Sequence, residues 1–205
     1  VQTNCYIVSN EETREAVVID PGDQGELIVE ALKRDSLQTR AILLTHGHSD
    51  HIGGLEAVKK ATGAKVYALD QERELLADEN LNLSKSLLGT IIREEADVWL
   101  RDGEKFSMIG YEFQVIGTPG HTTGSCCYYV ESEKALFAGD TLFEGPYGRV
   151  DLPGGSSVQL LHSVLDKLFE LPDDVNVYPG HLGYTTIGDE KKYNPLAPYK
   201  GKLLE

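Results

Sequence analysis

Three of the six histidines in this chain fall in one short stretch, His46-Gly47-His48-Ser49-Asp50-His51. The stretch directly follows an apolar run that ends at Leu44, which we expect to be a buried strand. Imidazole nitrogen and carboxylate oxygen are common protein ligands of zinc, iron and manganese. Gly47 allows the backbone to turn sharply enough for neighbouring rings to converge. The stretch therefore predicts a metal site rather than a chance group of structural histidines.

Three more residues of ligating type follow glycine or proline at the ends of expected strands. They are His121 in Gly117-Thr-Pro-Gly-His121, Asp140 in Phe137-Ala-Gly-Asp140, and His181 in Tyr178-Pro-Gly-His181. Each one alone is a weak signal, because a single histidine after a turn is more often structural. Together with the histidine stretch, they favour one metal centre that draws ligands from distant parts of the chain.

The elements that must position these residues alternate between strands and helices. Runs rich in β-branched residues predict strands at 4–9, 16–19, 41–45, 65–68, 98–100, 105–108, 111–116, 125–130, 135–138 and 175–178. Apolar residues at helical spacing predict helices at 24–34, 52–61, 71–78 and 156–170. The stretch 79–89 fits either a flap or a packing helix, and we expect the tail after Tyr178 to be irregular. This order predicts sheets that are covered by helices on their outer faces.

The composition is that of an ordinary globular protein with an acidic surface. The 205 residues suffice for one domain over 1–205, with 40% hydrophobic and 25% charged residues. Because the chain opens at Val1 rather than at Met, we expect that a few native N-terminal residues are missing. The net charge of −14 disfavours nucleic acid as a partner.

Cysteine usage and hydropathy bear on the compartment. The three cysteines, of which Cys126 and Cys127 are adjacent, do not look like a disulfide framework and fit a reducing cytoplasm. We find no signal peptide and no apolar run near 18 residues, so we expect neither secretion nor a membrane span. Nothing in the sequence indicates an oligomeric state.

The order His-x-His-x-Asp-His, then a distant His, an Asp and a last His, resembles the ligand order of the metallo-β-lactamase superfamily. The likeness covers nearly the whole chain and includes Asp20-Pro21-Gly22, the stretch 139–155 and Pro179-Gly-His181. Within the superfamily, the chain is most similar to small bacterial glyoxalase II-like, or hydroxyacylglutathione hydrolase-like, hydrolases. The resemblance implies an α/β protein of the αββα type. This is a four-layer sandwich of two mixed β-sheets with helices on the outer faces.

The resemblance also implies a role for each candidate residue. His46, His48 and His121 would bind a first metal ion, and Asp50, His51 and His181 a second one, with Asp140 as the bridging ligand. We expect two divalent ions, zinc first, with iron or manganese as alternatives. Two metals about 3.5–4 Å apart can share a bridging hydroxide, which would attack an acyl carbonyl. Asp50 and Asp140 are therefore the expected catalytic residues.

The expected substrate is a small thioester or ester. Tyr147 and Arg149 are possible substrate contacts. Where glyoxalase II has a glutathione-binding lysine and a nearby tyrosine, this chain has Arg149 and Asp151. Only residues 182–205 follow His181, where glyoxalase II carries a longer helical region. Recognition of glutathione is therefore open.

The alternative is a mono-iron persulfide dioxygenase-like oxidoreductase. Such enzymes share the fold and the pattern of Gly148-Arg149-Val150-Asp151. Their single iron would use the positions of His46, His121 and Asp140.

Other polar residues have plainer interpretations. We expect His162 to be a surface or packing residue and the adjacent Cys126 and Cys127 to be buried in a strand. Arg149 and Asp151 could form an ion pair that holds the loop 145–155. Asp20 could either orient a ligating imidazole or cap a turn.

Overall fold

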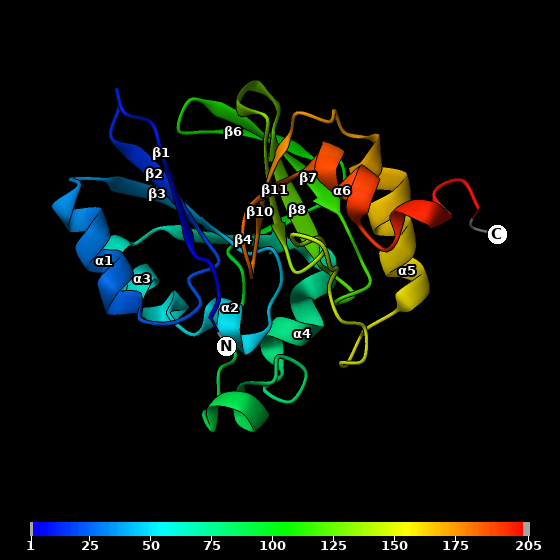
Figure 1. The fold of residues 1–205 in the computed structure, drawn as a ribbon. Helices are drawn as coiled ribbons and strands as arrows, with labels where there is room; N and C mark the ends of the chain where they lie inside the picture. Colours follow the sequence, from blue (N-terminus) through cyan, green and yellow to red (C-terminus); the bar gives the residue numbers. More distant parts are fainter. Residues whose placement is uncertain (1, 203–205) are drawn as a thin grey trace.

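The computed structural model describes residues 2–202 and shows two β-sheets that face each other, with helices on their outer sides (Figure 1). The first sheet has the strand order β1-β2-β3-β4-β5. Its strands are β1 (Tyr6–Ser9), β2 (Glu15–Ile19), β3 (Gln38–Leu43), β4 (Lys65–Leu69) and β5 (Val98–Leu100). β1 is antiparallel to β2 and the other pairs are parallel, so the sheet is mixed.

Parallel neighbours need connections that cross over the sheet, and helices provide them here. β2 leads to β3 through α1 (Gly25–Arg34), and β3 leads to β4 through α2 (Ser49–Ile52) and α3 (Leu55–Thr62). Between β4 and β5 lie three short turns of helix, η1 (Asp70–Glu72), α4 (Arg73–Ala77) and the π-helical η2 (Ser84–Leu88).

The second sheet has the strand order β11-β10-β9-β8-β7-β6. Its strands are β6 (Lys105–Met108), β7 (Tyr111–Gly117), β8 (Cys126–Val130), β9 (Ala135–Gly139), β10 (Asn176–Pro179) and β11 (Thr185–Thr186). β9 and β10 are parallel, and the other described pairs are antiparallel. Shorter elements complete the described chain: η3 (Glu131–Glu133), α5 (Ser157–His162), η4 (Ser163–Lys167), η5 (Leu168–Glu170), α6 (Ile187–Tyr193) and η6 (Ala197–Tyr199).

Three apolar cores separate the layers. Alternate residues of a strand point to opposite faces, so Val17 and Ile19 of β2 join the core between the two sheets, whereas Val18 joins the core that includes residues of α1 and α3. A third core joins the other face of the second sheet to the helical segment 157–170. Three cores between four layers confirm the predicted αββα sandwich of two mixed sheets.

The helix expected over 52–61 is observed as α3, which begins three residues later and has Gly54 as its N-cap. The Gly53-Gly54 pair separates it from α2, a short helix that was not expected and that carries Asp50 and His51. A Cβ atom at Gly54 would meet Gly25 at 3.0 Å, and one at Gly53 would collide with the carbonyl of Gly22. Glycine is therefore required where this segment passes the start of α1.

The tail is also more regular than expected, since it contains α6. Thr186 caps this helix by accepting a hydrogen bond from Asp189 N at 3.1 Å. Within residues 2–202, no helix has the length and hydropathy that crossing a membrane would require.

Candidate metal centre

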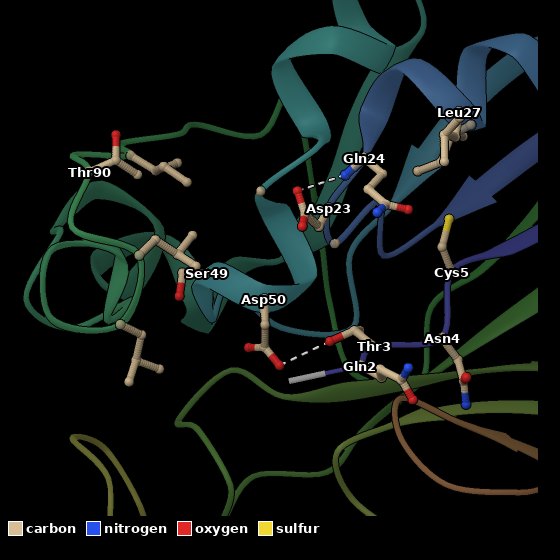
Figure 2. A pocket seen from close by; sticks show the side chains of 16 residues that line it. Gln2, Thr3, Asn4, Cys5, Asp23, Gln24, Leu27, Ser49, Asp50 and Thr90 are labelled. Carbon is tan, nitrogen blue, oxygen red and sulfur yellow. Dashed lines mark hydrogen bonds between the residues drawn. The ribbon is translucent and has the colours of Figure 1, made fainter.

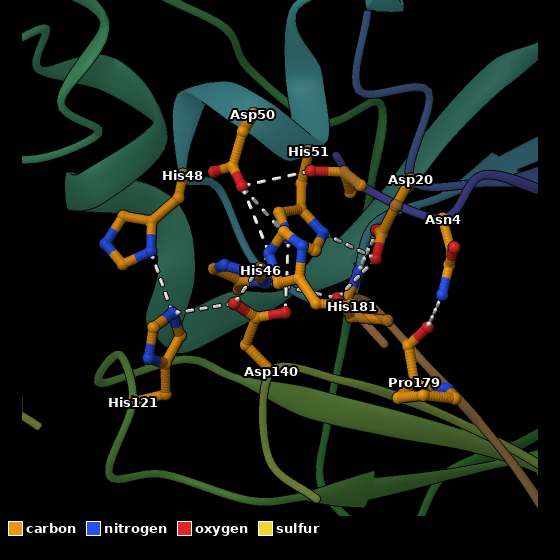
Figure 3. Close-up of polar contacts among 12 residues, drawn as sticks. Asn4, Asp20, His46, His48, Asp50, His51, His121, Asp140, Pro179 and His181 are labelled. Atoms are coloured by element: carbon orange, nitrogen blue, oxygen red, sulfur yellow. Dashed lines mark hydrogen bonds and ion pairs between the residues drawn. The ribbon is translucent and has the colours of Figure 1, made fainter. Parts of the chain in front are cut away.

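The predicted ligands follow four strands that end at the same edge of the molecule. β7 and β9 are both antiparallel to β8, and β10 is parallel to β9, so β7, β9 and β10 point the same way. Their C-terminal ends carry His121, Asp140 and His181 to one edge. The end of β3 meets this edge, where Cys126 N donates a hydrogen bond to Thr45 O at 2.9 Å. The two sheets thus bring all seven predicted ligands together (Figure 3).

The first group consists of His46, His48 and His121. One ring nitrogen from each lies within 4.8 Å of the other two, as expected for side chains that could share a metal ion. His48 Nδ1 and His121 Nε2 approach to 2.9 Å. All three side chains are buried.

The second group consists of Asp50, His51 and His181, whose ligand atoms also lie within 4.8 Å of one another. His181 Nε2 is 3.2 Å from Asp50 Oδ2, which also accepts a hydrogen bond from Thr3 at 3.0 Å. His181 Nδ1 donates to Gln2 O at 2.6 Å, so the start of the chain orients this ring.

Asp140 lies between the two groups. Its Oδ2 atom is 3.5 Å from His121 Nε2 and 3.3 Å from His181 Nε2, while its Oδ1 atom is 3.2 Å from His51 Nε2. The carboxylate therefore faces ring nitrogens from both groups, which is the position predicted for a bridging ligand.

Burial keeps the first group uncharged. Burial, together with the rings of His121 and His51, lowers the pKa of His48 to about 3. Burial is also the main cause that lowers the pKa of His46 and of His121. Neutral imidazole is the form that binds metal, so these rings are available as ligands at neutral pH.

The second group has the opposite electrostatics. Burial alone would lower the pKa of His51, but the charges of Asp140 and Asp20 raise it well above its ordinary value. Burial is likewise outweighed at His181, where hydrogen bonds to Asp140 and Asp50 raise the pKa to about 10. The carboxyl pKa of Asp50 is lowered despite burial, chiefly by its hydrogen bond to His181.

Several atoms at the centre have no hydrogen-bond partner within residues 2–202. These buried atoms are His46 Nε2, His48 Nε2, His51 Nε2 and Asp140 Oδ1. The last two face each other at 3.2 Å but do not form a hydrogen bond. A buried polar atom without a partner is costly, so several of them at one place indicate a binding site. Because imidazole and carboxylate are donors that zinc, iron and manganese accept, the residues fit divalent metal ions.

Asp20 contacts Thr45 and His51, and so supports the residues of the candidate centre. One carboxylate oxygen accepts the amide of Thr45 at 2.8 Å, and the other accepts Thr45 Oγ1 at 2.6 Å and faces His51 Nδ1 at 2.9 Å. Both interpretations of Asp20 are therefore confirmed, since it orients a candidate ligand and also fixes the turn before His46. Sequence reasoning missed Thr3 and Gln2, and it missed a buried glutamate, Glu72, that contacts both histidine loops.

The predicted substrate contacts lie beside the centre rather than in it. The guanidinium of Arg149 is turned toward Asp151, with two hydrogen bonds of 2.7 Å, and both side chains are exposed. The ion pair was predicted, whereas the contact of Arg149 with substrate stays a prediction, as does that of Tyr147. The carbonyl of Arg149 accepts a hydrogen bond from His121 Nδ1 at 2.8 Å.

The remaining expectations about single residues are confirmed. His162 is partly exposed and pairs with Asp166 at 2.6 Å. Cys126 and Cys127 are buried in β8, where burial raises the pKa of both thiols.

Comparisons with known proteins agree with this geometry. The family model described as Metallo-beta-lactamase superfamily matches residues 1–181. Hydroxyacylglutathione hydrolase GloC of Haemophilus influenzae is 34% identical over 197 residues, which are 95% of this chain and 92% of that protein. The crystal structure of BLEG-1 B3 metallo-beta-lactamase matches with a TM-score of 0.91 and 42% identity, covering 96% of this chain and 95% of that one. TTHA1623 in a di-iron-bound form matches with a TM-score of 0.83 and 35% identity, covering 95% and 94%.

The matches confirm the family and the fold that the ligand order predicted, and they indicate a metal-dependent hydrolase. The family model spans the chain from its first residue to His181, the last of the predicted ligands. On this match, and on relatives that align over nearly the full length, the chain belongs to the metallo-beta-lactamase superfamily.

Proposed function

We propose that this protein is a binuclear, glyoxalase II-like hydrolase that cleaves a small thioester or ester. The observation that carries the proposal is the position of Asp140, whose carboxylate lies 3.2–3.5 Å from ring nitrogens of both ligand groups. The relative from Haemophilus influenzae, named as a hydrolase of hydroxyacylglutathione, supports a thioester as substrate.

The two groups define the proposed ligands. His46, His48 and His121 would hold one ion, Asp50, His51 and His181 the other, and Asp140 would be shared. We propose zinc, with iron or manganese as alternatives, and the di-iron form of TTHA1623 supports iron as one of them. When bound, two divalent ions supply a hydroxide nucleophile at neutral pH and polarise the acyl carbonyl.

Asp50 has a free oxygen for the chemistry. Its Oδ2 atom is occupied by Thr3 and His181, while no polar contact among residues 2–202 uses Oδ1. This oxygen can orient the nucleophile and take its proton. A thiolate leaving group with a pKa near ~8.5 departs without protonation, so a thioester needs no general acid here.

A cavity of about 930 Å³ borders Asp50 and offers room for part of a substrate (Figure 2). Leu87 and Leu88 of η2 are exposed on one wall of it. None of the described residues that line it is Lys or Arg, so it provides no cation for the carboxylates of glutathione. The cavity therefore favours a substrate whose bulky part is uncharged. Its other walls come from Gln2–Cys5, Gly22–Gln24, Leu27, Ile28, Ser49, Gly53, Thr90 and Ile92.

The proposed partner is thus a small-molecule acyl thioester or ester, not a nucleic acid. The net charge of −14 supports this choice. We propose the reducing cytoplasm as the compartment, which the free thiols of Cys5, Cys126 and Cys127 support.

The test is hydrolysis of two thioesters by zinc-loaded protein. One is S-D-lactoylglutathione, and the other carries the same acyl group on an uncharged thiol, N-acetylcysteamine. We expect turnover that disappears in chelator-stripped protein and returns on reloading, with a higher kcat/KM for the uncharged thioester.

Failure to cleave either thioester or an aryl ester, in protein that has bound two metals per chain, would overturn the proposal. Persulfide-dependent oxygen uptake by iron-loaded protein would then support the mono-iron alternative. That alternative would use His46, His121 and Asp140 alone.

A further inference from the structure

Glu72 is a buried carboxylate that the proposed chemistry does not use. It ends η1, directly before α4, and it has no solvent exposure, whereas Glu74 on the next turn is exposed. Glutamate is rarely buried completely unless it is paired. None of the ion pairs among residues 2–202 includes Glu72, so its partners must be uncharged donors.

The three donors come from the two loops that carry the first ligand group. Oε1 accepts the amide of Gly47 at 2.9 Å. Oε2 accepts the hydroxyl of Thr122 at 2.9 Å and the amide of Gly124 at 2.8 Å. Gly47 lies between His46 and His48, and Thr122 directly follows His121. One side chain therefore joins the backbone beside all three histidines.

The packing around Glu72 leaves these loops little freedom. A Cβ atom at Gly47 would lie 2.7 Å from the side chain of Leu76, and one at Gly124 would collide with the backbone of Glu72. Both loops are thus in direct contact with the segment 71–76. Burial raises the pKa of Glu72 to about 7, while the hydrogen bonds from Gly47, Thr122 and Gly124 lower it.

We propose that Glu72 is a positioning residue for the first metal site, which holds the His46–His48 loop and the His121 loop at the separation that a shared metal ion requires. The proposal rests on the proposed metal centre but not on its substrate. Glu72 does not contact the metal itself. It acts through the Gly47 amide and the Thr122–Gly124 turn, as outer hydrogen-bond partners of metal ligands do in other sites.

Glu72→Gln is the most informative variant, because it keeps the size of the side chain but replaces one carboxylate oxygen by an NH2 group. Whichever way the amide is turned, its NH2 group faces the N–H of either Gly47 or Gly124, and two donors cannot pair. Glu74→Gln, on the exposed side of α4, is the matched control. Thr122→Val removes one donor and keeps the carboxylate.

The measurement is binding of zinc and of cobalt to the full chain, without substrate. Chelator competition gives the affinity of each site, and the His181→Ala variant, which lacks a second-site ligand, identifies the step that belongs to the first site. We expect Glu72→Gln to weaken the first site by about 10–100-fold and to change the visible absorption of cobalt there. The second site should stay within about threefold, and Glu74→Gln should resemble the unmodified protein.

A folded Glu72→Gln protein with unchanged first-site affinity and an unchanged cobalt spectrum would overturn the proposal. Equal loss at both sites would also overturn it, because that result indicates a general effect on folding. If Glu72→Gln does not fold, Thr122→Val decides, since it must weaken the first site selectively by a smaller factor. Failure of the unmodified chain to bind two metals would instead count against the proposed function.

Discussion

The two ligand groups of the metal centre differ in charge and in the parts of the chain that hold them. The first group is three buried imidazoles whose pKa values are lowered, and Glu72 holds their loops. The second group combines Asp50 with two histidines whose pKa values are raised. It is held by Asp20 and by the N-terminal segment.

The difference indicates how each group would receive a metal ion in the proposed binuclear centre. Neutral rings in the first group are ready to bind, so that site depends on the positions of its loops. In the second group, protons on His51 and His181 are stabilised by carboxylates and must leave when a metal binds. That site also depends on a contact between two distant parts of the chain, because Asn4 N donates a hydrogen bond to Gly180 O at 2.7 Å.

Replacing Asp140, which lies between the two groups, should have the largest effect. We expect Asp140→Ala to lower kcat/KM for the preferred thioester by about 1,000-fold or more, because nucleophile and carbonyl lose their electrostatic support together. Steady-state kinetics with metal analysis would measure it. Asp174→Ala, an exposed carboxylate paired with Lys134, is the control. Full activity in Asp140→Ala would remove the bridging role.

The pH dependence of metal binding should separate the two groups. His181 has a pKa of about 10, so at pH 7–9 its proton competes with the metal at the second site. Raising the pH removes that competitor, and the second-site affinity should rise at least tenfold per pH unit, and therefore at least about 100-fold over two units. The first site should be nearly flat, because the pKa of His48 is about 3.

Chelator-corrected zinc titrations at pH 7, 8 and 9 would measure both slopes. The His181→Ala variant reports the first site alone and should reproduce the flat line. Equal slopes at the two sites would contradict the electrostatic comparison.

Asp20→Asn should affect the second group more than the first, because Asp20 contacts His51 directly but reaches His46 only through Thr45. The amide can offer one oxygen where the carboxylate accepts Thr45 N, Thr45 Oγ1 and the ring of His51. We expect a 10–100-fold weaker second site, in line with other changes to the partners of ligating histidines. Asp35→Asn, at an exposed pair with Arg34, is the control. Competition titrations in which the first site weakens more than the second would reverse the assignment of Asp20.

The fold and the grouping of the candidate ligands could be predicted because their signals are local. A strand followed by glycine and then by His or Asp is visible within a few residues at His121, Asp140 and His181, and the stretch His46–His51 begins three residues after β3 ends. The order of strands and helices then restricts the layers that can form. The predicted sandwich follows from these short patterns and from the resemblance that the ligand order carries.

Asp20 was predicted as a supporting residue, but Glu72 and Thr3 could not be predicted because their partners are remote. Glu72 accepts hydrogen bonds from residues 25, 50 and 52 positions away, and nothing near it distinguishes it from the exposed Glu74. Thr3 reaches Asp50 across 47 positions in the same way. The tail is different, since the helix α6 begins with a local capping signal, Thr186 with Asp189.

The smallest expected effect is at Arg149, which tests how far the centre extends toward the solvent. Its guanidinium pairs with Asp151 on an exposed loop, and solvent screens such pairs so that they contribute little to stability. Its carbonyl, which accepts the hydrogen bond from His121, is kept in Arg149→Ala. The free energy of unfolding should therefore hardly change, and the affinity of the first site should not change.

If the side chain contacts substrate, the substitution should raise KM for S-D-lactoylglutathione about threefold with kcat unchanged, because uniform binding is lost. Lys134→Ala, which breaks another exposed pair, is the control for the kinetics. Unchanged KM for both thioesters would remove Arg149 from the substrate contacts. A lower metal affinity of the first site would mean that the side chain of Arg149, and not only its carbonyl, holds His121. The first ligand group would then depend on the exposed loop as well as on Glu72.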